Sequence, residues 1–153
     1  MFIDKFKIGS DCPVFIIAEL SANHNGSLET AKETIRAAKR AGANCIKLQT
    51  YTADTITMNH KSNDFKISQG TIWDGKYLYD LYKEAYTPWE WHEELFNEAK
   101  QQGLVCFSSP FDKTAVDFLE KLNVPAYKIA SFEITDIPLI EYVASKNKPV
   151  IIS

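Results

Sequence analysis

The stretch VFIIAEL at residues 14–20 and the stretch CIKLQT at residues 45–50 are apolar runs of strand length, and they decide the fold. Between them, Ser27 is the expected N-cap of a helix that Gly42 ends. Four apolar residues keep helical spacing inside it: Leu28, Ala31, Ile35 and Ala38. A strand, a helix and a second strand in this order predict parallel strands covered by helices.

The same alternation continues to the last residue. Further strands are expected at 104–108, 126–130 and 149–153. The segment 77–86 predicts a short helix. A longer one is expected to begin at Thr87-Pro88-Trp89-Glu90, which offers a cap, a proline in the first turn and a glutamate three residues after the cap. The helices after the third and fourth strands are indicated by apolar residues at helical spacing: Ala115, Phe118, Leu119 and Leu122, then Ile137, Ile140 and Ala144.

Two architectures fit this order, an open doubly wound sheet and a (β/α)8 barrel. The first turn after a strand, SANHNG at 21–26, is not a GxGxxG dinucleotide loop, which weakens the open sheet without excluding it. Residues 51–76 form a long polar connection, and a loop of this length is usually functional or a lid.

Composition excludes several classes of protein. Of the 153 residues, 45% are hydrophobic and 24% charged, and the net charge of −3 forms no basic stripe, which argues against a nucleic-acid partner. No apolar run approaches the ~20 residues of a membrane helix. The start, MFIDKFKIGSDCPVF, lacks the apolar region of a signal peptide, so we expect a cytoplasmic protein with reduced thiols at Cys12, Cys45 and Cys106.

Polar side chains lie in the last part of every expected strand or just beyond it, and Lys47 and Gln49, two apart, should share one face. The whole set is Glu19, Asn23 and His24; Lys47 and Gln49; Ser108 and Ser109; Lys128, Ser131 and Glu133; and Ser153. In a barrel the carboxyl ends of the strands converge on one face, where such enzymes build their sites. Five polar strand ends are hard to explain by packing, so we predict a site there.

Each group also has a structural interpretation. Lys47 and Lys128 could simply neutralise Glu19 and Glu133, because an unpaired buried charge is costly, yet such pairs at strand ends would themselves indicate a site. One of the two serines before Pro110 could only shape the turn, and His24 could only brace its loop. Surface positions are expected for His60 and His92, and packing roles for the aromatic residues between 73 and 91.

Two lysines and several hydroxyl groups on one face suit an anionic ligand such as a phosphate or a carboxylate. A nearby carboxylate can move protons. The residues therefore predict chemistry on a phosphorylated or carboxylated small molecule, without naming it.

Four motifs in order, AELSANHNG, IKLQTY, FSSPFD and YKIASFE, resemble the sialic acid synthase family, which condenses phosphoenolpyruvate with an amino sugar. The segments ELSANHNGS, TYTADTIT and IWDGKYLYDLYKEAYTPWEWH are most similar to the branch that uses 2,4-diacetamido-2,4,6-trideoxy-altrose. The resemblance runs from Phe15 to Ser153.

The family resemblance implies an α/β fold, a (β/α)8 TIM barrel, here truncated after about the fifth strand because a full barrel takes ~250 residues. Residues 1–153 would be the N-terminal part of the barrel. The remaining strands and a C-terminal antifreeze-like (SAF) domain would lie outside them, in a domain-swapped homodimer, and the fragment alone should be inactive.

By motif, the resemblance assigns Glu19 to the essential glutamate near the sugar and Glu133 to the glutamate that handles the attacking water. Positions that hold phosphoenolpyruvate match Lys47, Ser109, Lys128 and Ser131. Lys128 is also counted as catalytic. Sugar-side or further active-site positions match Gln49, Asn23 and Ser153.

The resemblance also implies a divalent metal, Mn2+ or Mg2+, that polarises the sugar aldehyde. Its two histidine ligands are expected outside this chain, because His24, His60 and His92 match neither. Three alternatives stay open: a sibling synthase for N-acetylneuraminate or legionaminate, a Schiff-base aldolase using Lys47 or Lys128, and a non-catalytic sugar or anion binder on a partial barrel.

Overall fold

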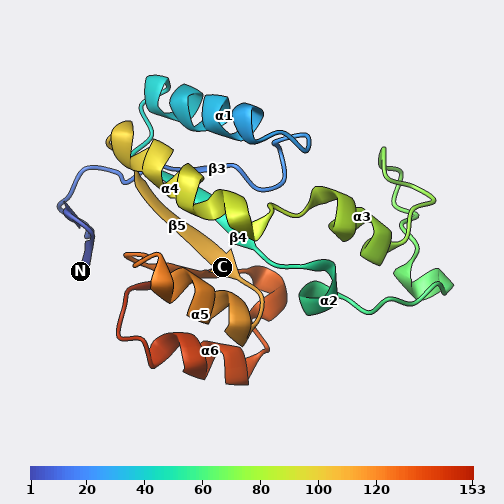
Figure 1. Ribbon diagram of the computed structural model, residues 1–153. Helices are drawn as coiled ribbons and strands as arrows, with labels where there is room; N and C mark the ends of the chain where they lie inside the picture. Colours follow the sequence, from blue (N-terminus) through green and yellow to red (C-terminus); the bar gives the residue numbers. More distant parts are fainter.

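A computed structural model describes residues 1–153, and its centre is a parallel sheet of five strands (Figure 1). The strands are β3 (Ile17–Glu19), β4 (Cys45–Thr50), β5 (Val105–Pro110), β6 (Tyr127–Ile129) and β7 (Val150–Ile152). Each strand pairs in parallel with the next one along the chain, in the order β3-β4-β5-β6-β7. An open doubly wound sheet reverses its strand order at a switch point, and this sheet does not. The order is that of a (β/α)8 barrel.

Helices cover the outer face of this sheet. They are α1 (Leu28–Arg40), α4 (His92–Gln101), α5 (Lys113–Lys121) and α6 (Ile137–Ala144). Alternate strand residues pack against them: Ile46 and Leu48 of β4 share one core cluster with Ile35 and Leu95. The Ser27 cap is confirmed, since its hydroxyl accepts from the backbone N–H of Thr30 at 3.2 Å. None of these helices has the length and apolar character that a membrane crossing requires.

The other face of the sheet changes character along the strands. A hairpin that the sequence did not predict, β1 (Phe2–Ile3) and β2 (Phe6–Lys7), lies at the amino ends of the strands (Figure 1). Its buried Ile3 packs with inward-facing residues at that end, namely Cys45, Val105, Phe107 and Ala126. Further along β4 the inward positions are Lys47 and Gln49. The interior is therefore apolar at one end and polar at the other.

Three expectations from the sequence need correction. The first strand is shorter than residues 14–20, and Val14 and Ile16 are exposed. Thr87 caps no helix: its hydroxyl is buried without a partner, and a 3-10 turn, η2 (Trp89–Trp91), precedes α4. The connection at 51–76 contains a short helix, α2 (Ala53–Ile56), that was not expected, whereas the short helix expected at 77–86 is confirmed as α3 (Leu78–Ala85).

The cysteine expectation is confirmed in part by burial. All three thiols are free, and Cys45 and Cys106 are buried, whereas Cys12 is partly exposed. Burial raises the pKa of the Cys45 and Cys106 thiols, so these groups stay protonated and unreactive.

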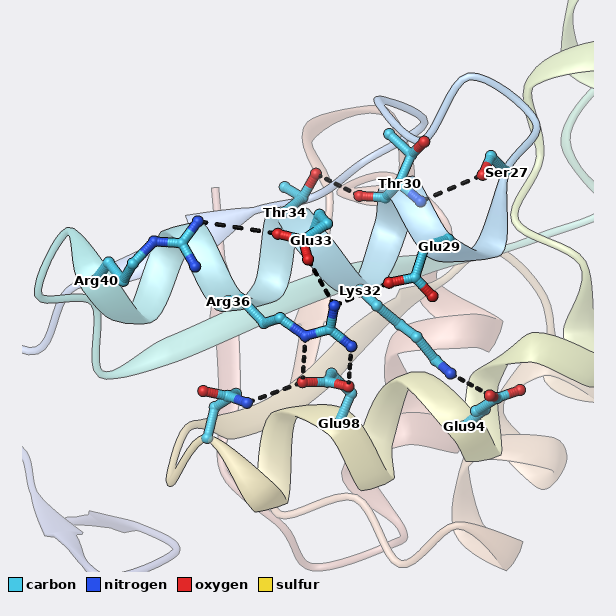
Figure 2. A network of polar contacts seen from close by, with 11 residues as sticks. Ser27, Glu29, Thr30, Lys32, Glu33, Thr34, Arg36, Arg40, Glu94 and Glu98 are labelled. Atoms are coloured by element: carbon cyan, nitrogen blue, oxygen red, sulfur yellow. Dashed lines mark hydrogen bonds and ion pairs between the residues drawn. The ribbon is translucent and has the colours of Figure 1, made fainter.

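Helices α1 and α4 are joined by a network of charged side chains (Figure 2). The guanidinium of Arg36 donates to both carboxylate oxygens of Glu98, at 3.1 and 3.0 Å. The same carboxylate accepts from the amide of Gln102 at 2.9 Å, while Lys32 pairs with Glu94 nearby. Only 8% of the Glu98 side chain is exposed, so this forked pair is screened less than an ordinary surface ion pair.

We expect Glu98→Gln to lower the free energy of unfolding by about 1–3 kcal/mol, because Arg36 loses its forked partner. The matched control is Glu94→Gln, whose side chain is 52% exposed and whose loss should cost under about 1 kcal/mol. Hydrogen bonds from Arg36 hold the pKa of Glu98 below its ordinary 4.5. Glu98→Gln should therefore lose more unfolding free energy than Glu94→Gln above pH 4.5, and this excess loss should vanish as the pH falls through the lowered pKa. Urea unfolding at several pH values measures it, and equal losses in both variants would contradict this account.

Candidate active site

A pocket of about 360 Å3 opens where the strands end. Six of the nine predicted site residues line it: Glu19, Lys47, Gln49, Lys128, Ser131 and Ser153. They come from β3, β4, β6, the turn after β6 and the residue after β7. Strand ends that are far apart in sequence thus supply one polar wall.

Lys47 and Glu19 form the ion pair that the sequence suggested. They are opposite each other in the register of β4 and β3, and Lys47 Nζ lies 3.4 Å from Glu19 Oε1. The lysine side chain is 7% exposed and the glutamate 57% exposed. The pair therefore has a buried cation and a carboxylate that remains open to the pocket.

Lys128 forms no ion pair with Glu133, so the structural alternative considered for this lysine is wrong. Its ammonium group donates to the carbonyl of Ile129 at 2.8 Å and to the hydroxyl of Ser153. Burial, and then the positive charge of Lys47, lower the pKa of Lys128. Two cations thus face one pocket with a single carboxylate paired to them, which favours an anionic ligand.

Glu133 ends a 3-10 turn, η3 (Ser131–Glu133), beside the pocket. Its Oε2 atom is buried and has no hydrogen-bond partner. Burial raises the pKa of this carboxyl group, which brings its titration closer to neutral pH. A carboxyl group in this state suits proton transfer.

The remaining predicted residues lie at different distances from the pocket. Ser109 is fully buried on the inward face, opposite Gln49 in the register of β5 and β4, and its hydroxyl has no partner. Ser108 faces outward and bonds to Thr50 at 2.7 Å, so it is the serine with a structural contact. Asn23 is exposed in the loop after β3 and does not line the pocket.

The histidines have three different environments. His24 is buried and braces its loop, since its Nδ1 accepts from the N–H of Gly26 at 3.2 Å. His60 is exposed, as expected. The surface position expected for His92 is wrong, because this side chain is fully buried and burial lowers its pKa to about 4.

Aromatic and aliphatic residues that line the pocket were not predicted from the sequence. Tyr82 of α3 meets Tyr51 edge to face at 5.7 Å, and Tyr51 meets Phe111 in the same way at 5.4 Å. These three residues and Ile56 of α2 line the pocket. The packing role expected for the aromatic residues between 73 and 91 is incomplete, because Tyr82 both packs and lines the pocket. The long connection after β4 therefore walls the pocket.

The described residues do not fit a resident metal ion. No group of three His, Cys, Asp or Glu side chains is arranged to hold one. A metal site built from protein groups alone needs several such ligands, whereas Mg2+ can also be held by one or two carboxylates together with substrate phosphates. The divalent ion that the resemblance implies therefore has no ligand set made of protein groups alone within residues 1–153.

The sequence model of the NeuB family matches residues 34–153, and the chain belongs to this family. It is 53% identical over 144 residues to the pseudaminic acid synthase of Campylobacter jejuni, covering 94% of this chain and 42% of that protein. It is 55% identical over 141 residues to the pseudaminic acid synthase of Helicobacter pylori, covering 92% and 41%. The N,N'-diacetyllegionaminic acid synthase of Legionella pneumophila is 39% identical, with 95% and 40% covered.

Solved structures agree with the sequence relatives. An N-acetylneuraminic acid synthetase of Leptospira borgpetersenii, in complex with citrate, superposes with a TM-score of 0.83 at 30% identity, covering 99% of this chain and 48% of that one. The spore coat polysaccharide biosynthesis protein SpsE of Bacillus subtilis gives 0.77 at 35%, covering 99% and 39%. The predicted fold class is thus confirmed. The chain spans about 42% of the length of the first relatives it matches.

Proposed function

We propose that this chain is the N-terminal part of a synthase that condenses phosphoenolpyruvate with 2,4-diacetamido-2,4,6-trideoxy-L-altrose, giving pseudaminic acid and phosphate. The observation that carries the proposal is the pair of lysines, Lys47 and Lys128, facing one pocket in a chain more than half identical to two pseudaminic acid synthases. Further strands would close the barrel, and a C-terminal antifreeze-like domain would follow in a domain-swapped homodimer. The reaction would take place in the cytoplasm.

Binding would begin with the anionic substrate. Lys47 and Lys128 would donate charge-assisted hydrogen bonds to the carboxylate and phosphate of phosphoenolpyruvate. The hydroxyl groups of Ser109, Ser131 and Ser153 would complete its contacts, and the unpartnered hydroxyl of Ser109 supports this. Gln49, Asn23 and Glu19 would lie on the side of the sugar.

The chemical step forms a bond between C3 of phosphoenolpyruvate and the aldehyde carbon of the open-chain sugar. The aldehyde oxygen takes up a proton, and positive charge develops at C2. Water adds to C2, its proton passes to Glu133, and the bond between C2 and the bridging oxygen breaks so that phosphate leaves. The raised pKa of Glu133 supports this role, because a carboxyl group that titrates nearer neutrality can accept and return the proton.

The family resemblance adds Mn2+ or Mg2+, which would polarise the aldehyde from ligands outside residues 1–153. No step above depends on it, and the groups of this chain account for anion binding and for the proton transfer at C2.

Phosphate release by the full-length protein tests the proposal. The substrates are phosphoenolpyruvate and a panel of sugars: the diacetamido altrose, N-acetylmannosamine and the corresponding diacetamido mannose. We expect release with the altrose sugar and at least a hundredfold lower kcat/KM with the others. Release with another sugar would move the protein to a sibling synthase, and release with none would contradict the family chemistry.

A Schiff-base aldolase is a second candidate because burial lowers the pKa of Lys128, which makes its amine more nucleophilic. Borohydride reduction in the presence of pyruvate separates the two. The synthase account expects no covalent adduct on Lys128, and a trapped adduct there would favour the aldolase.

A further inference from the structure

The turn from Trp89 to His92 contacts the chain at the ends of two strands, β3 and β4. The indole N–H of Trp89 donates to the carbonyl of Tyr51 at 3.1 Å, just beyond β4. Trp91 meets His24 of the loop after β3 edge to face at 5.4 Å. His92 contacts the hydroxyl of Thr50 at 2.9 Å. The segment that follows α3 is therefore fixed to these strand ends by three residues of one turn.

His92 stands at one end of a directed chain of buried hydrogen bonds. Its Nδ1 lies 3.2 Å from the carbonyl of Pro88, which can only accept, so Nδ1 carries the proton. Nε2 of the neutral ring then accepts from the hydroxyl of Thr50. The Thr50 oxygen in turn accepts from the hydroxyl of Ser108 at 2.7 Å. Each of the three side chains has a partner, and the directions follow from the contact between Nδ1 and the carbonyl of Pro88.

This chain lies one residue away from two candidate substrate contacts. Thr50 and Ser108 point outward from β4 and β5, toward the start of α4. Their neighbours Gln49 and Ser109 point inward and are opposite each other in the register of the two strands. Because successive side chains of a strand leave on opposite faces, fixing the outward pair fixes the direction of the inward pair.

We propose that Thr50, Ser108 and His92 are positioning residues, which hold Gln49 and Ser109 in the geometry that binds the substrates. The inference rests on the proposed function, since it assigns Ser109 to phosphoenolpyruvate and Gln49 to the sugar. It differs from a purely structural role, because a network that only stabilises the fold would alter unfolding without altering affinity.

The test uses the full-length protein and two identical substitutions at buried threonines. Thr50→Val removes the central hydroxyl of the chain, and Thr87→Val removes a buried hydroxyl that has no partner. We expect Thr50→Val to raise the phosphoenolpyruvate Kd, measured by calorimetry, about tenfold, the effect of one unsatisfied buried hydrogen bond transmitted to the site. Thr87→Val should leave Kd unchanged.

Variants of His92 and of Ser109 separate positioning from damage to the fold. His92→Gln keeps an acceptor for Thr50 and should retain most of the affinity for phosphoenolpyruvate. His92→Phe removes the acceptor and should weaken phosphoenolpyruvate binding. In a Ser109→Ala background, Thr50→Val should weaken phosphoenolpyruvate binding no further, because its target is gone.

The possible failures are distinguishable. Equal Kd values for Thr50→Val and Thr87→Val, or full additivity with Ser109→Ala, would overturn the positioning role. Absence of phosphate release by the unmodified protein that still binds phosphoenolpyruvate would contradict the proposed function and leave the affinity comparison to decide the inference. Failure to bind phosphoenolpyruvate at all would overturn both.

Discussion

Glu133→Gln is expected to lower kcat of the full-length protein by about a hundredfold to ten-thousandfold, the usual contribution of a general acid or base. The substitution keeps the shape of the side chain and removes its ability to take a proton from water. Phosphoenolpyruvate affinity should change little, because Lys47 and Lys128, which are proposed to bind the anion, are unchanged. Steady-state phosphate release and calorimetry measure the two quantities.

The same substitution should raise thermal stability at pH 7. Burial without a partner raises the pKa of Glu133 above its ordinary 4.5, so the folded protein holds this proton more tightly than the unfolded chain. Stability from this group is therefore lost as the pH rises from 4.5 through the raised pKa. The stability gained by Glu133→Gln should appear above that pKa and fade toward pH 4.5.

Glu141→Gln, at an exposed position of α6, is the control and should change neither kcat nor stability. An active Glu133→Gln protein would remove Glu133 from the mechanism.

Lys128→Met is expected to weaken phosphoenolpyruvate binding by about ten- to hundredfold for each charge-assisted hydrogen bond lost. Its pKa is lowered below 10.5, mainly by burial, so its charge costs folding free energy at neutral pH. Removing that charge should therefore not reduce the free energy of unfolding at pH 7. Calorimetry and urea unfolding on the same samples separate affinity from stability.

The control for Lys128→Met is Lys83→Met, an exposed lysine of α3 outside the candidate pocket. It should leave the Kd of phosphoenolpyruvate within a factor of two at moderate salt. Salt screens exposed charges over the Debye length, which is about 8 Å at physiological ionic strength. A similar loss in both variants would mean that the protein attracts the anion by its overall field, with no site at Lys128.

Much of the fold could be predicted because periodicity was strong where the core is. The strand at Cys45–Thr50 has the predicted bounds, since its outward residues fill the cluster under α1 and α4. The cap of α1 was predictable from local chemistry at Ser27. The start of α4 could not be predicted in this way, because Thr87 is buried in the interior and a 3-10 turn follows Pro88. The hairpin at Phe2–Lys7 was missed because two-residue strands carry no periodic signal.

The candidate site followed from a different signal, charged residues inside apolar strands. Alternation placed Lys47 and Gln49 on one face, and the structure brings both to the pocket. The partner of Lys128 was not predictable, because Ser153 is 25 residues away in the sequence while Glu133 is much nearer, and only the path of the backbone selects between them. The burial of His92 was not predicted, because the sequence of an amphipathic helix does not show which polar residue of its first turn faces inward.

The most direct measurement is the fate of oxygen when the full-length protein turns over phosphoenolpyruvate and the diacetamido altrose in water labelled with heavy oxygen. If water adds to C2 at this pocket and the bond between C2 and the bridging oxygen breaks, the released phosphate will be unlabelled and a nine-carbon acid will accumulate in equal amount. Labelled phosphate, or phosphate released without the acid, would mean attack at phosphorus and would contradict the account.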